Sequence, residues 1–194
     1  NRSHINMDDE LKELRKVRFV QPFSGKTVRF LEGGQVFKKL KASTEVIIVS
    51  PFLSDVFFER INKRSYGKDE QISGNSRDDL GKVRSLVSTM DSFAKLFAKM
   101  KNIGKDKCIF LSGSNESGAE TGYYRVDMNL HAKIYCCKMA DGKAYCIVGS
   151  SNATVNGCDP NCDQSNKSGN VEFNIEFEIS EDDYEGFDKL LRGG

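Results

Sequence analysis

The sequence predicts an α/β fold in which a mixed β-sheet is flanked by helices on both faces. Short apolar runs of strand length alternate with longer segments of helical periodicity along the 194 residues. The run Glu45 to Ser50 (EVIIVS) is rich in β-branched apolar residues, which is typical of a strand buried on both faces. The segment Asn170 to Ile179 (NVEFNIEFEI) alternates apolar and polar residues, which indicates a strand with one buried face. Helices interleaved with such strands favour helices packed on both sides of one sheet.

Each element follows from periodicity and from the residues at its ends. Pro51 ends the strand that begins at Glu45, Ser54 can cap the next helix, and Thr89 or Asp91 can start the one after it. Helices are predicted at 9–17, 33–42, 55–63, 89–101 and 182–191. Strands are predicted at 27–31, 45–50, 82–88, 107–111, 129–137, 144–149 and 170–179. Polar loops are predicted at 64–81, 112–122 and 158–169.

The length fits one domain, residues 1–194, with its core in 18–180 and with residues 1–7 interpreted as a tag remnant. Hydrophobic residues make up 38% and charged residues 29% of the chain, as in ordinary globular proteins. No apolar run is long enough to span a bilayer and no signal peptide is visible, so we expect no stable membrane association.

Charge is distributed unevenly along the chain. Residues 1–107 carry 22 Lys plus Arg against 14 Asp plus Glu, whereas residues 108–194 carry 7 against 14. Such a balance could give one basic surface that faces a polyanion, or simply ordinary solvated helix faces. Charge alone therefore does not establish nucleic-acid binding.

The six cysteines are interpreted as reduced thiols of a cytoplasmic protein. Cys136, Cys137 and Cys146 lie in apolar strand-like runs, where free cysteine acts as a small hydrophobic residue. Cys158 and Cys162 have a spacing that could hold zinc, but no second well-spaced pair follows to complete four ligands. We therefore expect no metal site.

The candidate chemistry begins at His131, because the other histidine, His4, lies in the doubtful N-terminal stretch. Lys133 follows two residues later in NLHAKIYCC. In a strand these two side chains would share a face, about 6–7 Å apart along the backbone. One His-x-Lys pair alone is most often a strand with chance polar residues.

A second group of polar residues favours a functional site over a chance His-x-Lys pair. The strand 144–148 ends in Gly149, Ser150, Ser151 and Asn152, whose hydroxyls, amide and backbone N–H groups suit an anion. The segment 138–143 (KMADGK) has turn residues that would join this strand to the preceding one as a hairpin. His131 and Asn152 would then lie at the same end of the sheet, forming a phosphate site that contains a nucleophile.

The strand 170–179 can add a carboxylate. Its polar face carries Glu172, Asn174, Glu176 and Glu178, and the ordinary interpretation is a solvated face. One of these carboxylates could instead hold the second imidazole nitrogen of a catalytic histidine and fix its tautomer.

The order HAK, then GSSN, then Asn-x-Glu resembles the signature of the phospholipase D superfamily. The resemblance covers roughly 28–179, where EVIIVSPFLS, VRSLVSTMDSFAKL and CIFLSG precede the motif in the usual order. It implies a phospholipase D-like sandwich. It also implies catalytic roles for His131, Lys133, Ser150, Asn152 and Glu176, and substrate contacts for Gly149, Ser151, Glu172 and Asn174. Glu176, in Asn174-Ile175-Glu176, is the better match to the family's glutamate, although Glu172 stays open.

One position departs from the family pattern. In the family, His-x-Lys is followed by four residues and then an aspartate; that position is Lys138 here, while Asp141 is interpreted as a turn residue. That aspartate is largely supportive in the family, so its loss weakens the match without abolishing the chemistry. Some superfamily nucleases with restriction activity depart at the same place.

The resemblance implies a two-step displacement without metal or other cofactor. One histidine attacks phosphorus to give a phosphohistidine, and a second protonates the leaving oxygen and then activates water. The credible sequence offers one such histidine, so we expect a homodimer with one shared site. A fragment of a two-motif protein and an inactive protein are the alternatives.

The sequence indicates the substrate less directly than it indicates the reaction. Small single-motif members of the family resemble endonucleases, and Lys63, Arg64, Lys68 and Arg77 in or beside the first long loop could track phosphates. We therefore expect a DNA endonuclease of the restriction type, without a recognisable module for reading sequence. The alternatives are a phospholipid-hydrolysing enzyme and a non-catalytic nucleic-acid-binding module with a degenerate motif.

Overall fold

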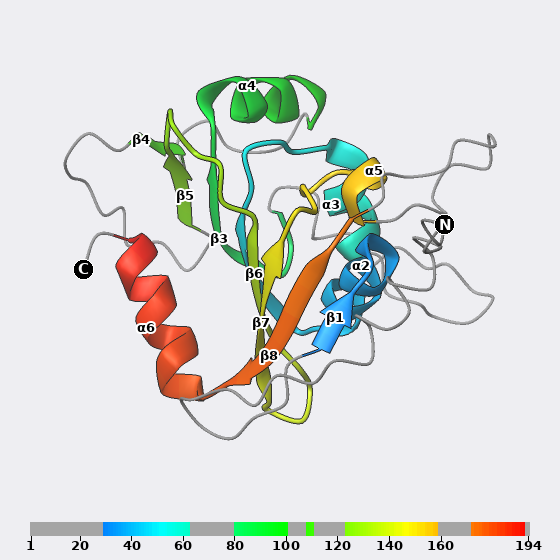
Figure 1. Cartoon of the computed structure of the whole chain (residues 1–194). Coiled ribbons are helices and arrows are strands. Elements are labelled where there is room, and N and C mark those ends of the chain that lie inside the picture. Colours follow the sequence, from blue (N-terminus) through cyan, green and yellow to red (C-terminus); the bar gives the residue numbers. More distant parts are fainter. Residues whose placement is uncertain (1–28, 63–79, 101–107, 111–122, 159–171, 193–194) are drawn as a thin grey trace, which may run out of the picture.

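The structure is a computed structural model, and it describes residues 29–62, 80–100, 108–110, 123–158 and 172–192. A twisted sheet runs through the molecule, with α2, α3 and α5 on one face, α6 on the other, and α4 across one end (Figure 1). The helices are α2 (Gly33–Ala42), α3 (Asp55–Asn62), α4 (Met90–Lys99), α5 (Val155–Cys158) and α6 (Glu181–Leu191). The predicted α/β class, with helices on both faces of the sheet, is therefore confirmed.

The described strands form one sheet of eight strands in the order β1-β8-β7-β6-β2-β3-β5-β4. They are β1 (Arg29–Leu31), β2 (Glu45–Val49), β3 (Val83–Ser88), β4 (Cys108–Phe110), β5 (Tyr123–Val126), β6 (Ile134–Lys138), β7 (Ala144–Gly149) and β8 (Asn174–Ile179). Strands β2, β3, β5 and β4 run parallel, while β1, β8, β7, β6 and β2 pair antiparallel. The sheet is therefore mixed, as expected.

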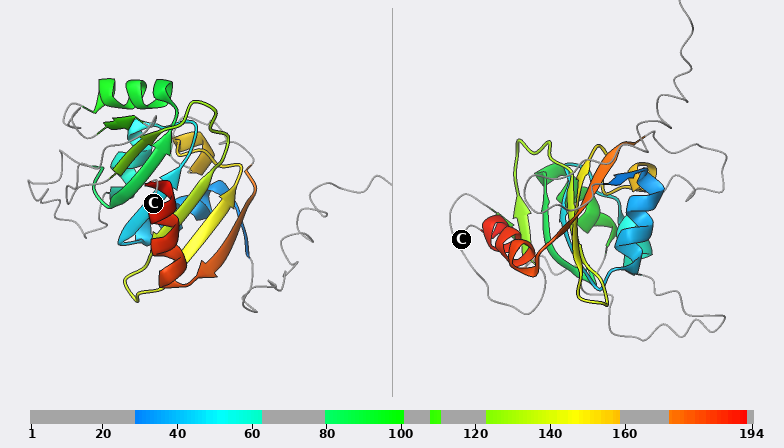
Figure 2. Two further views of the ribbon diagram at one scale, coloured as in Figure 1. Left: turned by 90° about the vertical axis from the view of Figure 1, so that its left-hand side faces the viewer. Right: turned by 60° about the horizontal axis from the view of Figure 1, so that its bottom comes forward.

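The central strands bury both of their faces. On β2, Val46 and Ile48 join the core beneath α2 and α3, whereas Ile47 joins a smaller core beneath α6. Tyr184 of α6 is fully buried in this smaller core. Figure 2 shows α6 lying on the side of the sheet opposite α2. This two-sided burial explains the continuous apolar run that predicted β2.

Several predicted elements match closely. The predicted bounds of α2 and β7 are those observed, and Thr89 caps α4 by accepting a 3.4 Å hydrogen bond from the Ser92 N–H. The β6–β7 hairpin is confirmed as well. Gly142 has φ +82° in its turn, and Asp141 Oδ1 accepts from the Lys143 N–H at 3.1 Å.

Two elements were not predicted, and two strands, β6 and β8, begin later than predicted. Strand β5 (YYRV) and helix α5 (VNGC) are each four residues long, which is too short for a clear periodic signal. Strand β6 begins at Ile134, so His131 and Lys133 precede the strand rather than belonging to it. The predicted helix 9–17 and the loops at 112–122 and 64–79 lie outside the described residues, as do residues 159–169 of the last predicted loop.

Candidate active site

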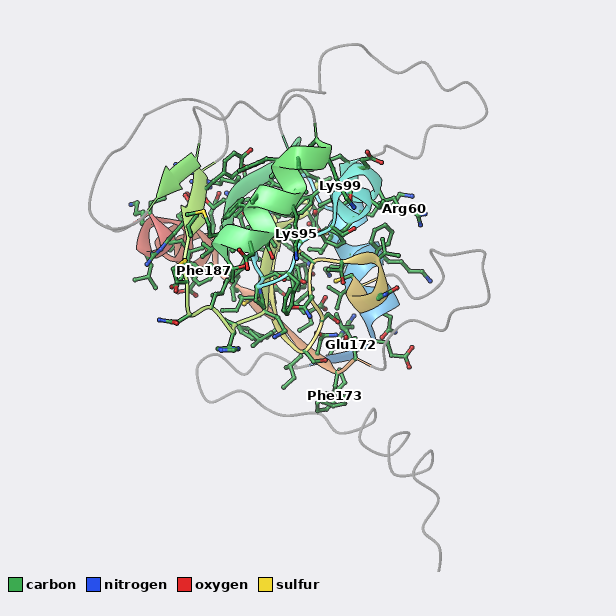
Figure 3. All side chains as sticks on the ribbon, turned by 90° about the horizontal axis from the view of Figure 1, so that it is seen from above. Arg60, Lys95, Lys99, Glu172, Phe173 and Phe187 are labelled. Atoms are coloured by element: carbon green, nitrogen blue, oxygen red, sulfur yellow. The ribbon has the colours of Figure 1, made fainter. Side chains whose placement is uncertain are left out.

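The two polar motifs meet at the end of the sheet where β6 begins and β7 ends. The Gly149 N–H donates a 3.2 Å hydrogen bond to the Lys133 carbonyl, which continues the β6–β7 ladder beyond Ile134. The backbone that carries HAK therefore lies directly beside the backbone that carries GSSN. Figure 3 views the molecule from this end. The register of β6 against β7 therefore brings the two motifs together, as the sequence predicts.

His131 and Lys133 sit in the extended segment that leads into β6. The His131 side chain is exposed and the Lys133 side chain is half-buried. The Lys133 ammonium donates a 3.0 Å hydrogen bond to the His131 carbonyl. The lysine therefore folds back along its own segment, which differs from the parallel projection of two side chains expected in a strand.

Ser150 and Glu172 form the closest side-chain contact of the site. The Ser150 hydroxyl donates to Glu172 Oε2 and accepts from the Phe173 N–H at 2.9 Å. The Ser150 N–H in turn donates to the Phe173 carbonyl at 3.1 Å. Glu172 thus lies at the end of the sheet with the GSSN segment, immediately before β8.

Ser151 and Asn174 brace this segment from below. Both residues are fully buried. The Asn174 amide donates to Ser151 Oγ at 2.8 Å and to the Leu31 carbonyl at 3.2 Å, and it accepts from the Ser151 N–H at 3.2 Å. Both side chains contact the chain itself in this arrangement, and their expected contact with substrate stays a prediction.

Gly149 allows the close approach on which this bracing depends. A Cβ at this position would overlap Asn174 Oδ1 and the Phe173 carbonyl. Any contact of Gly149 with substrate would therefore be made by its backbone atoms. Glycine is required here for close packing of two strands rather than for an unusual backbone angle.

Asn152 is the half-buried residue that follows. Its carbonyl accepts from the Thr154 N–H at 2.7 Å and from the Cys158 thiol at 3.1 Å. Its side-chain oxygen is buried and has no hydrogen-bond partner among the described residues. A buried amide oxygen without a donor is uncommon, so this side chain is available to a further group.

Glu176, the sequence-favoured partner of His131, has a different neighbour. It is 4% exposed and forms a 3.4 Å ion pair with Lys39 of α2. It lies opposite Ile147 in β7, two residues along β8 from the end of the sheet. The structure therefore brings Glu172, and not Glu176, to the GSSN segment. A contact of either carboxylate with His131 stays a prediction.

Two supporting residues were not singled out from the sequence. The Tyr135 hydroxyl donates to the Ser151 carbonyl at 2.7 Å, and burial raises the pKa of this phenol well above its usual value. Ser50 Oγ accepts from the Ala153 N–H at 2.9 Å. A tyrosine and a serine in apolar strand segments carry no sequence signal that separates such bracing from ordinary core packing.

Lys138 lies at the opposite end of β6 from the site. It pairs with Ala144 of β7 and Glu45 of β2, and its ammonium lies 3.1 Å from Glu181 and 2.8 Å from Glu185 of α6. Lys138, the residue at which the sequence departs from the resembled motif, therefore forms ion pairs that join the hairpin to α6. It does not reach the residues around Ser150.

The zinc interpretation of the last two cysteines stays untested because Cys162 lies outside the described residues. Cys158 is fully buried, and its thiol contacts the Asn152 carbonyl and, at 3.6 Å, the Tyr135 hydroxyl. Across the described ranges, no three His, Cys, Asp or Glu side chains gather in a way that would hold a metal ion.

Comparisons with known proteins assign no family to this chain. No protein-family model matches the chain, and no curated protein matches its sequence. Among the helices that the structure describes, none combines the length and the apolar character needed to cross a membrane.

Proposed function

We propose that this chain is a metal-independent phosphodiesterase, specifically a DNA endonuclease of the restriction type with a phospholipase D-like sandwich fold. The observation that carries the proposal is the pairing of Lys133 with Gly149 at the start of β6 and the end of β7. This pairing sets a histidine and a lysine beside a serine and an asparagine at one exposed end of the sheet. These residue types supply a nucleophile and several donors to a phosphate.

His131 is the proposed nucleophile. An imidazole nitrogen attacks phosphorus, the P–N bond forms, and the bond from phosphorus to the leaving oxygen breaks. A second histidine gives its proton to that oxygen and then removes a proton from water. The water oxygen attacks phosphorus, the P–N bond breaks, and His131 is regenerated.

The neighbouring side chains stabilise charge and hold the histidine. In this mechanism Lys133 and Asn152 donate to the non-bridging phosphate oxygens, and the Lys133 ammonium leaves the His131 carbonyl when substrate binds. Glu172, which already accepts from Ser150, is the carboxylate best placed to orient an imidazole at this end of the sheet. Ser151 and Asn174 then act as positioning residues.

The mechanism requires a second histidine, and we propose that it is the partner subunit's His131 in a homodimer. Large apolar side chains are exposed in segments that flank the strand ends at this end of the sheet: Phe52 is 60%, Met128 72% and Phe173 41% exposed. We take these exposed apolar side chains as part of the surface on which a second copy would dock. Contact between two copies there would bring two His131 side chains together across a two-fold axis.

DNA is the proposed substrate because cationic side chains are visible from the same end. Lys95 and Lys99 of α4 and Arg60 of α3 are seen in the view that also shows Glu172 (Figure 3). Lys95 is exposed, whereas Lys99 lies 3.2 Å from Asp55. Cationic side chains on the end of the molecule that carries the proposed site favour a polyanion as substrate. As part of the same proposal, the thiol-rich core favours a cytoplasmic location.

The decisive experiment is plasmid nicking in EDTA. We expect the unaltered chain to nick DNA, and His131→Ala to lose the activity completely. His4→Ala is the matched control, since it removes the other histidine. His131-dependent hydrolysis of phospholipid vesicles without DNA cleavage would instead establish the lipid alternative. Binding of DNA or RNA without cleavage of any phosphodiester would overturn the proposal in favour of a binding module.

A further inference from the structure

Two thiols face each other across the β6–β7 hairpin. Cys136 of β6 and Cys146 of β7 are direct partners in the register. Both belong to the smaller core beneath α6, where Tyr184 covers them. Cys136 is 1% exposed and Cys146 9%, so the pair lies at the margin of this core rather than in its centre.

The hydrogen-bond pattern of the hairpin fixes the type of this pair. The Met139 N–H donates to the Lys143 carbonyl at 2.8 Å, and the Gly149 N–H donates to the Lys133 carbonyl at 3.2 Å. Hydrogen-bonded and non-hydrogen-bonded pairs alternate along an antiparallel ladder, so Cys136 and Cys146 form a non-hydrogen-bonded pair. In such a pair the Cα atoms are about 4.5 Å apart and the side chains are closer, which is within the range of disulfides.

The two sulfur atoms already interact. A hydrogen bond with Cys146 raises the pKa of Cys136, and the same contact lowers the pKa of Cys146. The thiolate is the reactive form of cysteine. Cys146 is the more exposed of the two thiols, so it is the one that an oxidant reaches first.

We propose that Cys136 and Cys146 form a reversible cross-strand disulfide when the folded chain meets a peroxide. The Cys146 sulfur, as the thiolate, attacks one oxygen of hydrogen peroxide and the O–O bond breaks, which leaves a sulfenic acid on Cys146. The departing hydroxide takes up the proton that the Cys146 thiol released and becomes water. The Cys136 sulfur then attacks the sulfenic sulfur, the S–S bond forms as the S–O bond breaks, and the hydroxyl leaves as a second water with the Cys136 proton. The two cysteines lose two electrons in all, and the peroxide gains them.

The disulfide joins the two strands that lead to HAK and GSSN. Its bond lies three residues from Lys133 along β6 and three from Gly149 along β7. The pair does not require the proposed phosphodiesterase activity, because it depends only on the register of the hairpin. A chain without nuclease activity would form the same bond.

The test is peptide mapping after peroxide treatment of the folded full chain. Cleavage after lysine separates the peptide 134–138, which holds Cys136, from the peptide 144–167, which holds Cys146. We expect these two peptides to become joined, with the loss of two hydrogen masses, and to separate again with a dithiol reductant. Thermal unfolding should shift upward on oxidation and return on reduction.

Cysteine variants identify the bond. Cys137→Ser is the matched control, since Cys137 is adjacent, buried on the opposite face, and paired with Tyr145 rather than with a thiol. It should keep the link, whereas Cys136→Ser and Cys146→Ser should each abolish it. Circular dichroism and thermal unfolding of the reduced variants check that each is folded.

Three outcomes would overturn the proposal. One is a link that survives in Cys136→Ser, which would assign the bond to Cys137. Another is a stable sulfenic acid at Cys146 with Cys136 still free. The third is a link that forms only after denaturation, because the native register would then not be its cause.

Discussion

The ammonium of Lys138 lies 2.8 Å from Glu185 Oε1, which ties the turn end of the β6–β7 hairpin to helix α6. Arg84 of β3 holds the same carboxylate with two hydrogen bonds of 2.8 and 2.6 Å. Tyr184 lies beneath this group, and its hydroxyl donates to Glu45 at 3.0 Å. Lys138 therefore has a structural role in docking α6.

The first prediction concerns acid stability. Hydrogen bonds from Arg84 and then from Lys138 lower the pKa of Glu185 from 4.5 to about 2. A carboxylate with a lowered pKa in the folded state stabilises the fold above its unfolded pKa, and this contribution is lost as pH falls from about 4.5 to about 2. We expect Tm to fall more steeply over this range in the unaltered chain than in Glu185→Gln.

Salt and a matched variant complete this experiment. Because the carboxylate is partly exposed, the difference between the two chains should shrink in high salt. Glu178→Gln, on the neighbouring strand β8, is the control and should follow the unaltered profile. Parallel pH profiles for the unaltered chain and Glu185→Gln would contradict a stabilising role for the pair.

The second prediction separates the two candidate glutamates. Glu172→Gln should lower the rate of phosphodiester cleavage by about 10²-fold or more, because it removes the charge that orients a catalytic imidazole. Glu176→Gln should leave the rate near that of the unaltered chain. It should instead lower the free energy of unfolding by roughly 1–3 kcal/mol, because Lys39 loses its ion-pair partner.

Single-turnover cleavage and thermal unfolding, measured on both variants, test this assignment. The reverse result, with a rate lost only in Glu176→Gln, would restore the sequence-based choice. It would also mean that the end of β8 rearranges when substrate binds.

This choice shows what the sequence could not decide. Period-two alternation places Glu172, Asn174 and Glu176 on one face of the strand but does not say where the strand begins. Strand β8 begins at Asn174, which leaves Glu172 in the segment beside Ser150 and Glu176 against α2. Strand ends depend on tertiary pairing, which local periodicity does not contain.

The hairpin shows the opposite case. The turn residues Asp141 and Gly142 fixed the register of β6 against β7, and with it the meeting of HAK and GSSN. Strand β5 was missed because it is only four residues long and is held by pairing with β3 and β4 on either side, which local sequence does not reveal. The turn residues therefore predicted the hairpin, whereas the apolar content of a four-residue segment did not predict a strand.

The third prediction tests the bracing of the GSSN segment. Asn174→Ala leaves the Ser151 N–H and the Leu31 carbonyl without partners in a buried place. Each of the two unpaired groups costs about 1–3 kcal/mol, so we expect the free energy of unfolding to fall by about 2–6 kcal/mol. Ser151→Ala removes only the hydroxyl and should cost less. Urea unfolding measures both, and equal losses would argue against the amide as the main brace.

The fourth prediction compares two glycines. Gly149→Ala would force β7 away from the start of β8, because its Cβ would overlap Asn174 and the Phe173 carbonyl. We expect losses of both stability and cleavage. Gly186→Ala is the control, since nothing lies within 4 Å of a Cβ there and α6 would gain up to about 1 kcal/mol of helix propensity. A neutral Gly149→Ala, measured by urea unfolding, would contradict the close approach of the two strands.

The last prediction concerns the shared site and uses mixtures of subunits. If each cleavage needs His131 from both subunits, a dimer of one unaltered and one His131→Ala subunit is inactive. When the two chains are unfolded and refolded together at equal stability, activity should follow the square of the unaltered fraction. Equal amounts would then leave about one quarter of the activity, because random pairing makes one dimer in four fully unaltered. Independent sites would leave one half, and that linear dependence would assign the second proton transfer to another residue of the same chain.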